Sequence, residues 1–129
     1  SYNTIWSDSR IMNHKQVEEY LLSMPNAWLD YPFGEDVAVY KVGPQEKGKM
    51  FALVPEGKDP VRISLKCDPL LAKHLREEYE TVLEGYHLNK KHWNTIILTG
   101  QLPWEEIQGL IRHSYDLVSD GDEPTPSFE

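Results

Sequence analysis

Apolar and polar residues follow a helical period in three segments of the chain. The first segment begins at Asn13, an N-cap residue followed three positions later by Gln16, and runs to residue 24. Its apolar positions recur at i, i+3, i+4 and i+7: Val17, Tyr20, Leu21 and Met24. The second begins at Asp68, which caps a helix with Pro69 at its first position. The strongest helical signal follows Pro103, with an inward stripe formed by Ile107, Leu110, Ile111, Ser114, Tyr115 and Val118.

Three runs between the first two helices have the pattern of β-strands. They span residues 37–42, 49–54 and 61–66, and the loops between them, 43–48 and 55–60, contain Gly and Pro. Connections this short predict antiparallel hairpins. The last run alternates strictly between apolar Val61, Ile63 and Leu65 and polar Arg62, Ser64 and Lys66. This alternation predicts one buried sheet face and one face that meets solvent and carries positive charge.

Two further strands are expected before the last helix, at residues 81–86 and 95–99. Residues 25–36 are rich in turn formers and are interpreted as a loop. Three aromatic residues of that loop are expected to seal one end of the core: Trp28, Tyr31 and Phe33. The predicted order is α-β-β-β-α-β-β-α. Amphipathic helices and a sheet with one apolar face bury both surfaces in a two-layer α+β sandwich, with all helices on one face of an antiparallel sheet.

The composition fits one folded domain. The chain has 129 residues, of which 40% are hydrophobic and 26% are charged, and a formal net charge of −8. We expect a lead-in segment over residues 1–12, a single domain over 13–118 and a flexible acidic tail over 119–129. A single cysteine, Cys67, forms no intramolecular disulfide, and no apolar run reaches the about 18 residues of a membrane span. A cytoplasmic location without membrane contact is therefore expected.

No motif of catalysis, cofactor binding or metal binding has a diagnostic spacing. Cys67 precedes a helix N-terminus, which favours a reactive thiol, but a lone cysteine at a strand end is more often a small buried apolar residue. His87 and His92 are five residues apart without further ligands, so a zinc signature is absent. Glycine-rich phosphate loops are absent as well. The sequence predicts a protein that is not an enzyme and has no catalytic, cofactor or metal site.

The segment HLNKKHW, residues 87–93, concentrates cationic and aromatic side chains in an otherwise acidic protein. Its candidate nucleic-acid-binding residues are His87, Asn89, Lys90, Lys91, His92 and Trp93, to which the solvent-facing strand adds Arg62 and Lys66. Lysine supplies charge for phosphates, asparagine hydrogen bonds, and tryptophan a stacking surface. The alternative is that Trp93 is a buried anchor and that the two lysines belong to a solvated turn.

Several blocks of the chain resemble the MmcQ/YjbR family of small bacterial proteins. The blocks are PFGEDVAVYKV, GKMFALV, RISLKCDP, GYHLNKKHWNT and HSYDLV, and they lie between residues 17 and 118. The resemblance implies an α+β domain with a layout similar to that of type III secretion chaperones. It also implies DNA binding through a double wing of hairpin loops, which makes residues 43–48 and 55–60 candidate wings and the HLNKKHW segment a candidate contact surface. It implies no catalytic residue.

Two functions therefore compete. The first is DNA binding, with double-stranded DNA as the partner. Because affinity for duplex DNA comes mainly from phosphate neutralisation, an acidic domain with a small basic patch should bind weakly and with strong salt dependence. The second is a protein-interaction adaptor that receives a partner segment, or a second copy of the chain, on its open sheet face.

Overall fold

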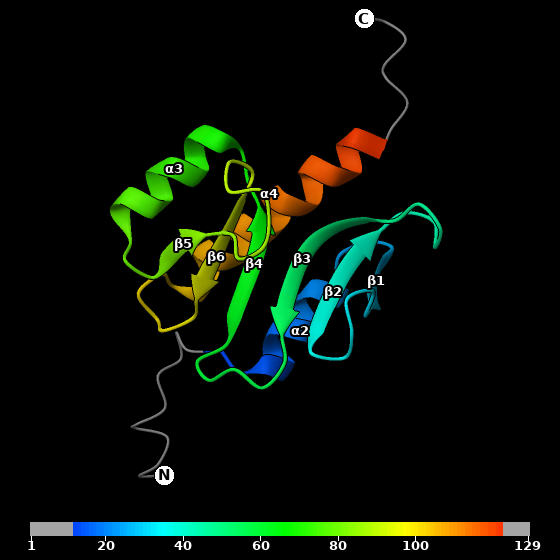
Figure 1. Cartoon of the computed structure of the whole chain (residues 1–129), viewed down its shortest axis with the longest axis horizontal. Coiled ribbons are helices and arrows are strands. Elements are labelled where there is room, and N and C mark those ends of the chain that lie inside the picture. Colours follow the sequence, from blue (N-terminus) through cyan, green and yellow to red (C-terminus); the bar gives the residue numbers. More distant parts are fainter. Residues whose placement is uncertain (1–11, 123–129) are drawn as a thin grey trace, which may run out of the picture.

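The computed structural model of the chain describes residues 12–122 (Figure 1). The helices are α2 (His14–Leu22), α3 (Pro69–Glu78) and α4 (Trp104–Asp122). The strands are β1 (Ala27–Asp30), β2 (Val37–Val42), β3 (Lys49–Pro55), β4 (Arg62–Lys66), β5 (Val82–Glu84) and β6 (Trp93–Ile97). The predicted lead-in over 1–12 lies almost wholly outside the described residues, as does the tail beyond residue 122.

The six strands form one open antiparallel sheet in the order β1-β2-β3-β4-β6-β5. This confirms the α+β class and the antiparallel hairpins, but the predicted element order lacks one strand. Residues 27–30, expected to be part of a loop, form β1 and pair with β2 from Ala27↔Val42 to Asp30↔Val39. In a strand of four residues between turn formers, the alternation of apolar and polar residues is too short to be recognised from sequence. The strand forms because the edge of β2 offers unpaired backbone groups.

The helix ends follow the chemistry of their caps. Asn13 and Gln16 form a complete capping box at the start of α2, and the Asp68 carboxylate accepts hydrogen bonds from the Leu70 and Leu71 amides at the start of α3. At the other end of the chain, α4 continues to Asp122. Four residues assigned from the sequence to the flexible tail are therefore helical.

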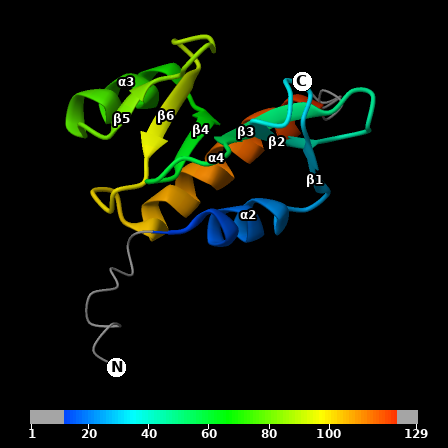
Figure 2. The ribbon, with the colours of Figure 1, turned by 60° about the horizontal axis from the view of Figure 1, so that its bottom comes forward.

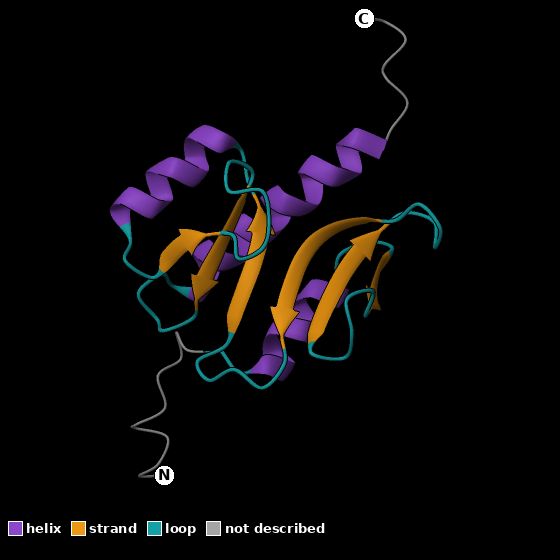
Figure 3. Ribbon diagram, viewed as in Figure 1, coloured by secondary structure: helices purple, strands orange, loops and turns teal. Residues whose placement is uncertain are grey.

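All three helices pack against one face of the sheet, as predicted. Their inward residues join a single core cluster with the strands: Val17 and Leu21 from α2, Ala72 and Leu75 from α3, and Ile107, Ile111 and Val118 from α4. Figure 2 shows α2 and α4 side by side on this face, where the Arg112 guanidinium donates to the Tyr20 hydroxyl at 2.7 Å. Figure 3 shows the strands in front of α4, so the opposite face has no helix on it; it is called the bare face below.

The bare face is less open than the alternation of β4 predicts. Val39, Leu53 and Trp93 form a second, smaller buried cluster there, against which Val37, Met50 and Leu88 pack. Ser64, expected to meet solvent, is buried, and its burial is tolerated because its hydroxyl shares a 2.8 Å hydrogen bond with the Thr95 hydroxyl on the neighbouring strand. The expectation of a solvent-facing side was therefore wrong for Ser64, although Arg62 is exposed and Lys66 is partly exposed.

Strands β3 and β4 pair over only two positions, Ala52↔Leu65 and Leu53↔Ser64. Beyond them the buried Ser114 hydroxyl of α4 enters the sheet, donating to the Phe51 carbonyl at 2.6 Å and accepting from the Lys66 amide at 2.9 Å. The hydroxyl replaces the direct strand-to-strand bond at the next position of the ladder. The longest helix is thereby bonded to the two central strands.

Candidate nucleic-acid interface

The loop between β5 and β6, residues 85–92, arches over the bare face at the end of β4 (Figure 1). Asn89 organises it internally: its side-chain oxygen accepts from the Lys91 amide at 2.9 Å, and its carbonyl accepts from the amides of His92 and Trp93. The His92 carbonyl in turn accepts from the Cys67 amide at 2.8 Å, which joins the loop to the end of β4. The side-chain oxygen of Asn89 and the carbonyls of Asn89 and His92 therefore hold the loop in place and are not available to a partner.

Trp93 is buried, with 8% of its surface exposed, so it does not serve as the stacking surface suggested by the sequence. The reason is its register: β6 begins at Trp93, two residues before the predicted strand, and Trp93 pairs with Lys66 on β4. Its side chain then falls on the bare face beneath Leu88 of the loop, in the second cluster. The alternative reading of Trp93 as a buried anchor was correct.

Three of the predicted cations lie at this end of the sheet. Lys90 and Lys91 are exposed on the loop, and Lys66 stands at the end of β4 where the loop is attached. Lys66, Lys90 and Lys91 are called the cationic site below. Arg62 is on the same face but at the other end of β4, with its Cα about 13 Å from that of Lys66 at about 3.3 Å per residue.

Two residues that sequence reasoning missed border the cationic site. Tyr86 is 74% exposed, and its ring stands 3.9 Å from that of the exposed His87, centroid to centroid. Arg76 reaches the loop from α3, where its Nη1 donates to the Lys90 carbonyl at 3.3 Å and to the Asn94 side chain at 2.6 Å. Tyr86 directly precedes the HLNKKHW segment in the sequence, so it could have been included there. No sequence signal indicated that Arg76 contacts this segment.

The two candidate wings lie at opposite ends of the sheet, because consecutive antiparallel connections alternate ends (Figure 1). Residues 55–60 are at the end away from the cationic site, and residues 43–48 are at the same end. The loops therefore do not form a pair of wings on one edge. Loop 43–48 and loop 85–92 lie at the same end of the sheet, the end that carries the cationic site.

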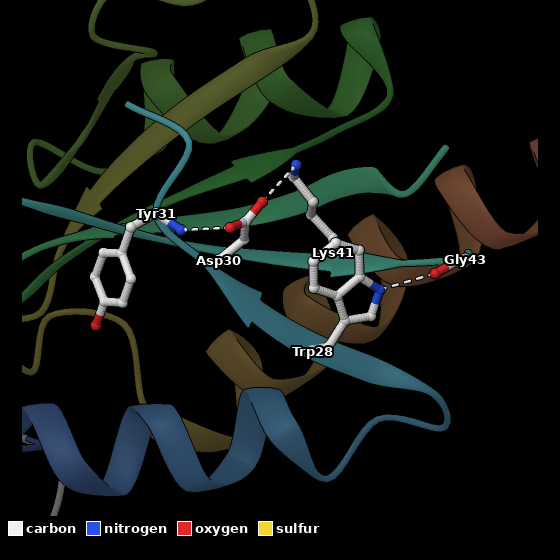
Figure 4. Close-up of polar contacts among 5 residues, drawn as sticks. All are labelled: Trp28, Asp30, Tyr31, Lys41 and Gly43. Carbon is white, nitrogen blue, oxygen red and sulfur yellow. Dashed lines mark hydrogen bonds and ion pairs between the residues drawn. The ribbon is translucent and has the colours of Figure 1, made fainter. Parts of the chain in front are cut away.

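Loop 43–48 is held firmly against β1 (Figure 4). The Trp28 indole donates to the Gly43 carbonyl at 2.8 Å, and a Cβ added at Gly48 would come within 2.6 Å of the Trp28 ring. Lys41 stacks over this ring, with its ammonium 5.4 Å from the centroid. Trp28 was expected to plug the core and instead supports the hairpin from the sheet.

The charge of Lys41 is already matched. Its ammonium lies 3.0 Å from the Asp30 carboxylate, which also accepts from the Tyr31 amide (Figure 4). The hydrogen bond from Lys41, followed by that from the Tyr31 amide, lowers the pKa of Asp30 below its ordinary value. Lys41 therefore contributes less to the field over the bare face than the cationic site does.

Charge is divided between the two layers of the fold. Among the side chains that the structure describes, up to residue 119, the helices carry seven Asp and Glu residues against four Lys and Arg. On the bare face the strands place three cations and one carboxylate, Asp30, which Lys41 neutralises. Loop 85–92 adds two lysines and no carboxylate. A chain with a net charge of −8 thus has a locally basic surface.

Cys67 lies in the hydrophobic core, between the end of β4 and the start of α3. It is buried, and burial, with a smaller contribution from the Asp68 carboxylate, raises the pKa of its thiol to about 11. The reading of Cys67 as a small buried residue was correct. Within residues 12–122, no group of three or more His, Cys, Asp or Glu side chains is arranged to hold a metal ion, and no helix has the length and apolarity to cross a bilayer.

Comparison with known sequences finds similar bacterial proteins. The sequence model of the YjbR family matches residues 22–117. The uncharacterised protein YbdF of Escherichia coli O157:H7 is 33% identical over 108 residues, which cover 84% of this chain and 85% of that protein. The uncharacterised protein YjbR of Escherichia coli K12 is 42% identical over 66 residues, which cover 51% of this chain and 56% of that protein.

Solved structures share the fold. The crystal structure of Deinococcus radiodurans protein DR2400, with a DUF419 domain, has a TM-score of 0.84 and 35% identity and covers 90% of this chain and 85% of that one. A crystal structure of a Pseudomonas syringae protein has a TM-score of 0.68 and 30% identity over 82% of this chain and 98% of that one. The names of these proteins assign no activity to the shared fold.

Proposed function

The chain belongs to the YjbR family, and we propose that it is a DNA-binding protein that holds the phosphate backbone against the bare face of its sheet, acting by binding and not by catalysis. The separation of charge between the two layers carries the proposal. The cationic site stands beside the bare face, whereas the helices on the other side are acidic. A polyanion is therefore attracted to one side of the molecule and repelled by the other.

The spacing of the cations suits a nucleic-acid backbone. Arg62 and Lys66 are separated by about 13 Å along β4, which corresponds to about four steps of a duplex axis. With Lys90 and Lys91, the surface offers four cations for phosphates. Since the whole chain has a net charge of −8, the attraction is local and the affinity low.

Salt dependence tests this function. If about four phosphates are neutralised, the affinity for a short DNA duplex should fall about 100-fold between about 50 and 200 mM salt, with a log–log slope of about −3 to −4. Fluorescence anisotropy of a dye-labelled duplex, titrated with the protein at several salt concentrations, measures the slope. Absence of binding at about 50 mM salt, or an affinity independent of salt, would overturn the proposal.

One observation favours the alternative, a protein-interaction adaptor. The edge strand β5 exposes Leu83 beside Tyr86, and a free strand edge accepts another strand by main-chain hydrogen bonds. If a second copy of the chain docks there, sedimentation velocity will show a dimer whose population rises with protein concentration and is lost on Leu83→Lys substitution. A monomer at every concentration leaves the DNA-binding proposal as the better one.

A further inference from the structure

A wide hollow of about 730 Å³ lies beside the edge strand β5, a volume within the range of small-ligand pockets. Leu83 forms part of its apolar wall, and Tyr86 and His87 stand along it. Two cations, Arg76 and Lys90, complete the lining together with one carboxylate, Glu84. Aromatic surface and positive charge thus meet at one place, next to the cationic site.

The aromatic part of the hollow is held by its backbone, whereas the Tyr86 ring contacts the His87 ring and is otherwise exposed. The amide of Tyr86 donates to the Thr95 hydroxyl at 3.3 Å, and that of Gly85 donates to the Trp93 carbonyl at 3.0 Å. A Cβ at Gly85 would lie 2.7 Å from that of Trp93, so only glycine permits this close approach of the loop to β6. The backbone that carries the exposed Tyr86 ring is therefore anchored to β6, which lowers the entropic cost of stacking on the ring.

The Arg76 guanidinium in the hollow is also held in place by hydrogen bonds within the protein. Arg76 is fixed by the two hydrogen bonds of its Nη1, and among the described residues its other guanidinium nitrogens make no hydrogen bond. Asn94, which accepts one of these bonds, is itself buried and donates to the Ala72 carbonyl at 3.1 Å. Lys90 is exposed and, within residues 12–122, its ammonium has no ion-pair partner.

We propose that this hollow receives an unpaired base of a single-stranded nucleic acid, which stacks on Tyr86 while the adjoining phosphate lies near Arg76 and Lys90. The inference rests on the proposed DNA binding and specifies that the preferred ligand is single-stranded. Every base has a π-face that stacks on an aromatic ring, and cations beside the ring bind the backbone. A duplex hides these faces, so a duplex contacts the cationic site but leaves the Tyr86 ring unused.

The test compares single-stranded and duplex oligonucleotides with variants of Tyr86. Since stacking on one aromatic ring contributes strongly to single-strand affinity, Tyr86→Ala should weaken single-strand binding about tenfold and change duplex binding by less than about twofold. Tyr86→Phe, which keeps the ring, should bind as the wild type does. Phe33→Ala is the matched control, because Phe33 is an exposed aromatic residue in the loop before β2, at the end of the sheet opposite to loop 43–48, and its removal should change neither affinity.

Fluorescence anisotropy measures these affinities with dye-labelled oligodeoxynucleotides and oligoribonucleotides of one sequence, and it shows whether DNA or RNA is preferred. Weaker single-strand binding by Tyr86→Ala, with either DNA or RNA, supports the inference. Unchanged single-strand binding in Tyr86→Ala, or equal weakening for single strands and duplexes, would overturn it while the salt-dependent duplex binding stands. If neither form binds the wild type at low salt, the proposed DNA binding fails as well.

Discussion

Replacement of Ser114 by alanine is expected to lower the free energy of unfolding by about 2 to 4 kcal/mol, because the Phe51 carbonyl and the Lys66 amide both lose the hydroxyl that bridges them. The Ser114 side chain is fully buried, and its hydroxyl is bonded to the Phe51 carbonyl and the Lys66 amide where β3 and β4 stop pairing. Alanine removes the hydrogen-bond partner of both groups. For a domain of this length the loss corresponds to a drop of about 10 °C in the melting temperature.

Thermal unfolding followed by circular dichroism measures this drop. Ser23→Ala is the matched control, since Ser23 also loses a hydroxyl bonded to a carbonyl, that of Tyr20, but at an exposed helix end. The control should change the unfolding free energy by no more than about 0.5 kcal/mol. Equal melting temperatures for the two variants would contradict the assignment of Ser114 as the bridge between α4 and the central strands.

Charge reversal in the loop is expected to have the largest effect on binding. Lys90→Glu combined with Lys91→Glu removes two phosphate contacts and adds two negative charges beside the cationic site. We expect duplex affinity at low salt to fall about 100-fold, and the salt slope to become smaller by about 2, because each lost contact removes about one released counterion. Both lysines are exposed, so folding should be unchanged.

A second pair of cations controls for net charge. Lys15 and Arg112 are exposed on α2 and α4, and Lys15→Glu with Arg112→Glu makes the same change in total charge on the helical side. This control should bind duplex within about threefold of the wild type, since screening limits the reach of exposed charges to about 10 Å. If both double variants lose affinity equally, net charge and not the cationic site governs binding.

Local chemistry made most of the fold predictable. The capping box at Asn13 and the carboxylate cap at Asp68 mark helix starts whatever the tertiary context, and both helices begin there. The alternation in β4 correctly placed Ile63 and Leu65 toward the helices. What the alternation could not show is that Ser64 is buried with its hydroxyl bonded to Thr95, because that partner comes from a strand 31 residues away.

The site was predictable in part. The motif of residues 87–93 correctly identified an exposed lysine pair, but the role of Trp93 depends on the register of β6. Extending the alternation of Thr95 and Ile97 back by two residues would have placed Trp93 on the same face. The position of Arg76 depends on how α3 docks through Asn94, a tertiary contact without a local sequence signal.

The central claim is that nucleic acid contacts the bare face at the cationic site, and a chemical-shift map of the isotope-labelled protein tests it most directly. On addition of a DNA duplex at low salt, the shifted backbone amides should cluster at Lys66 and at residues 85–92, and the shifts should vanish by about 0.2 M salt. The amide resonances of α2 and α4 should not shift. Shifts that are absent, spread over the whole chain or confined to the helices would contradict the account.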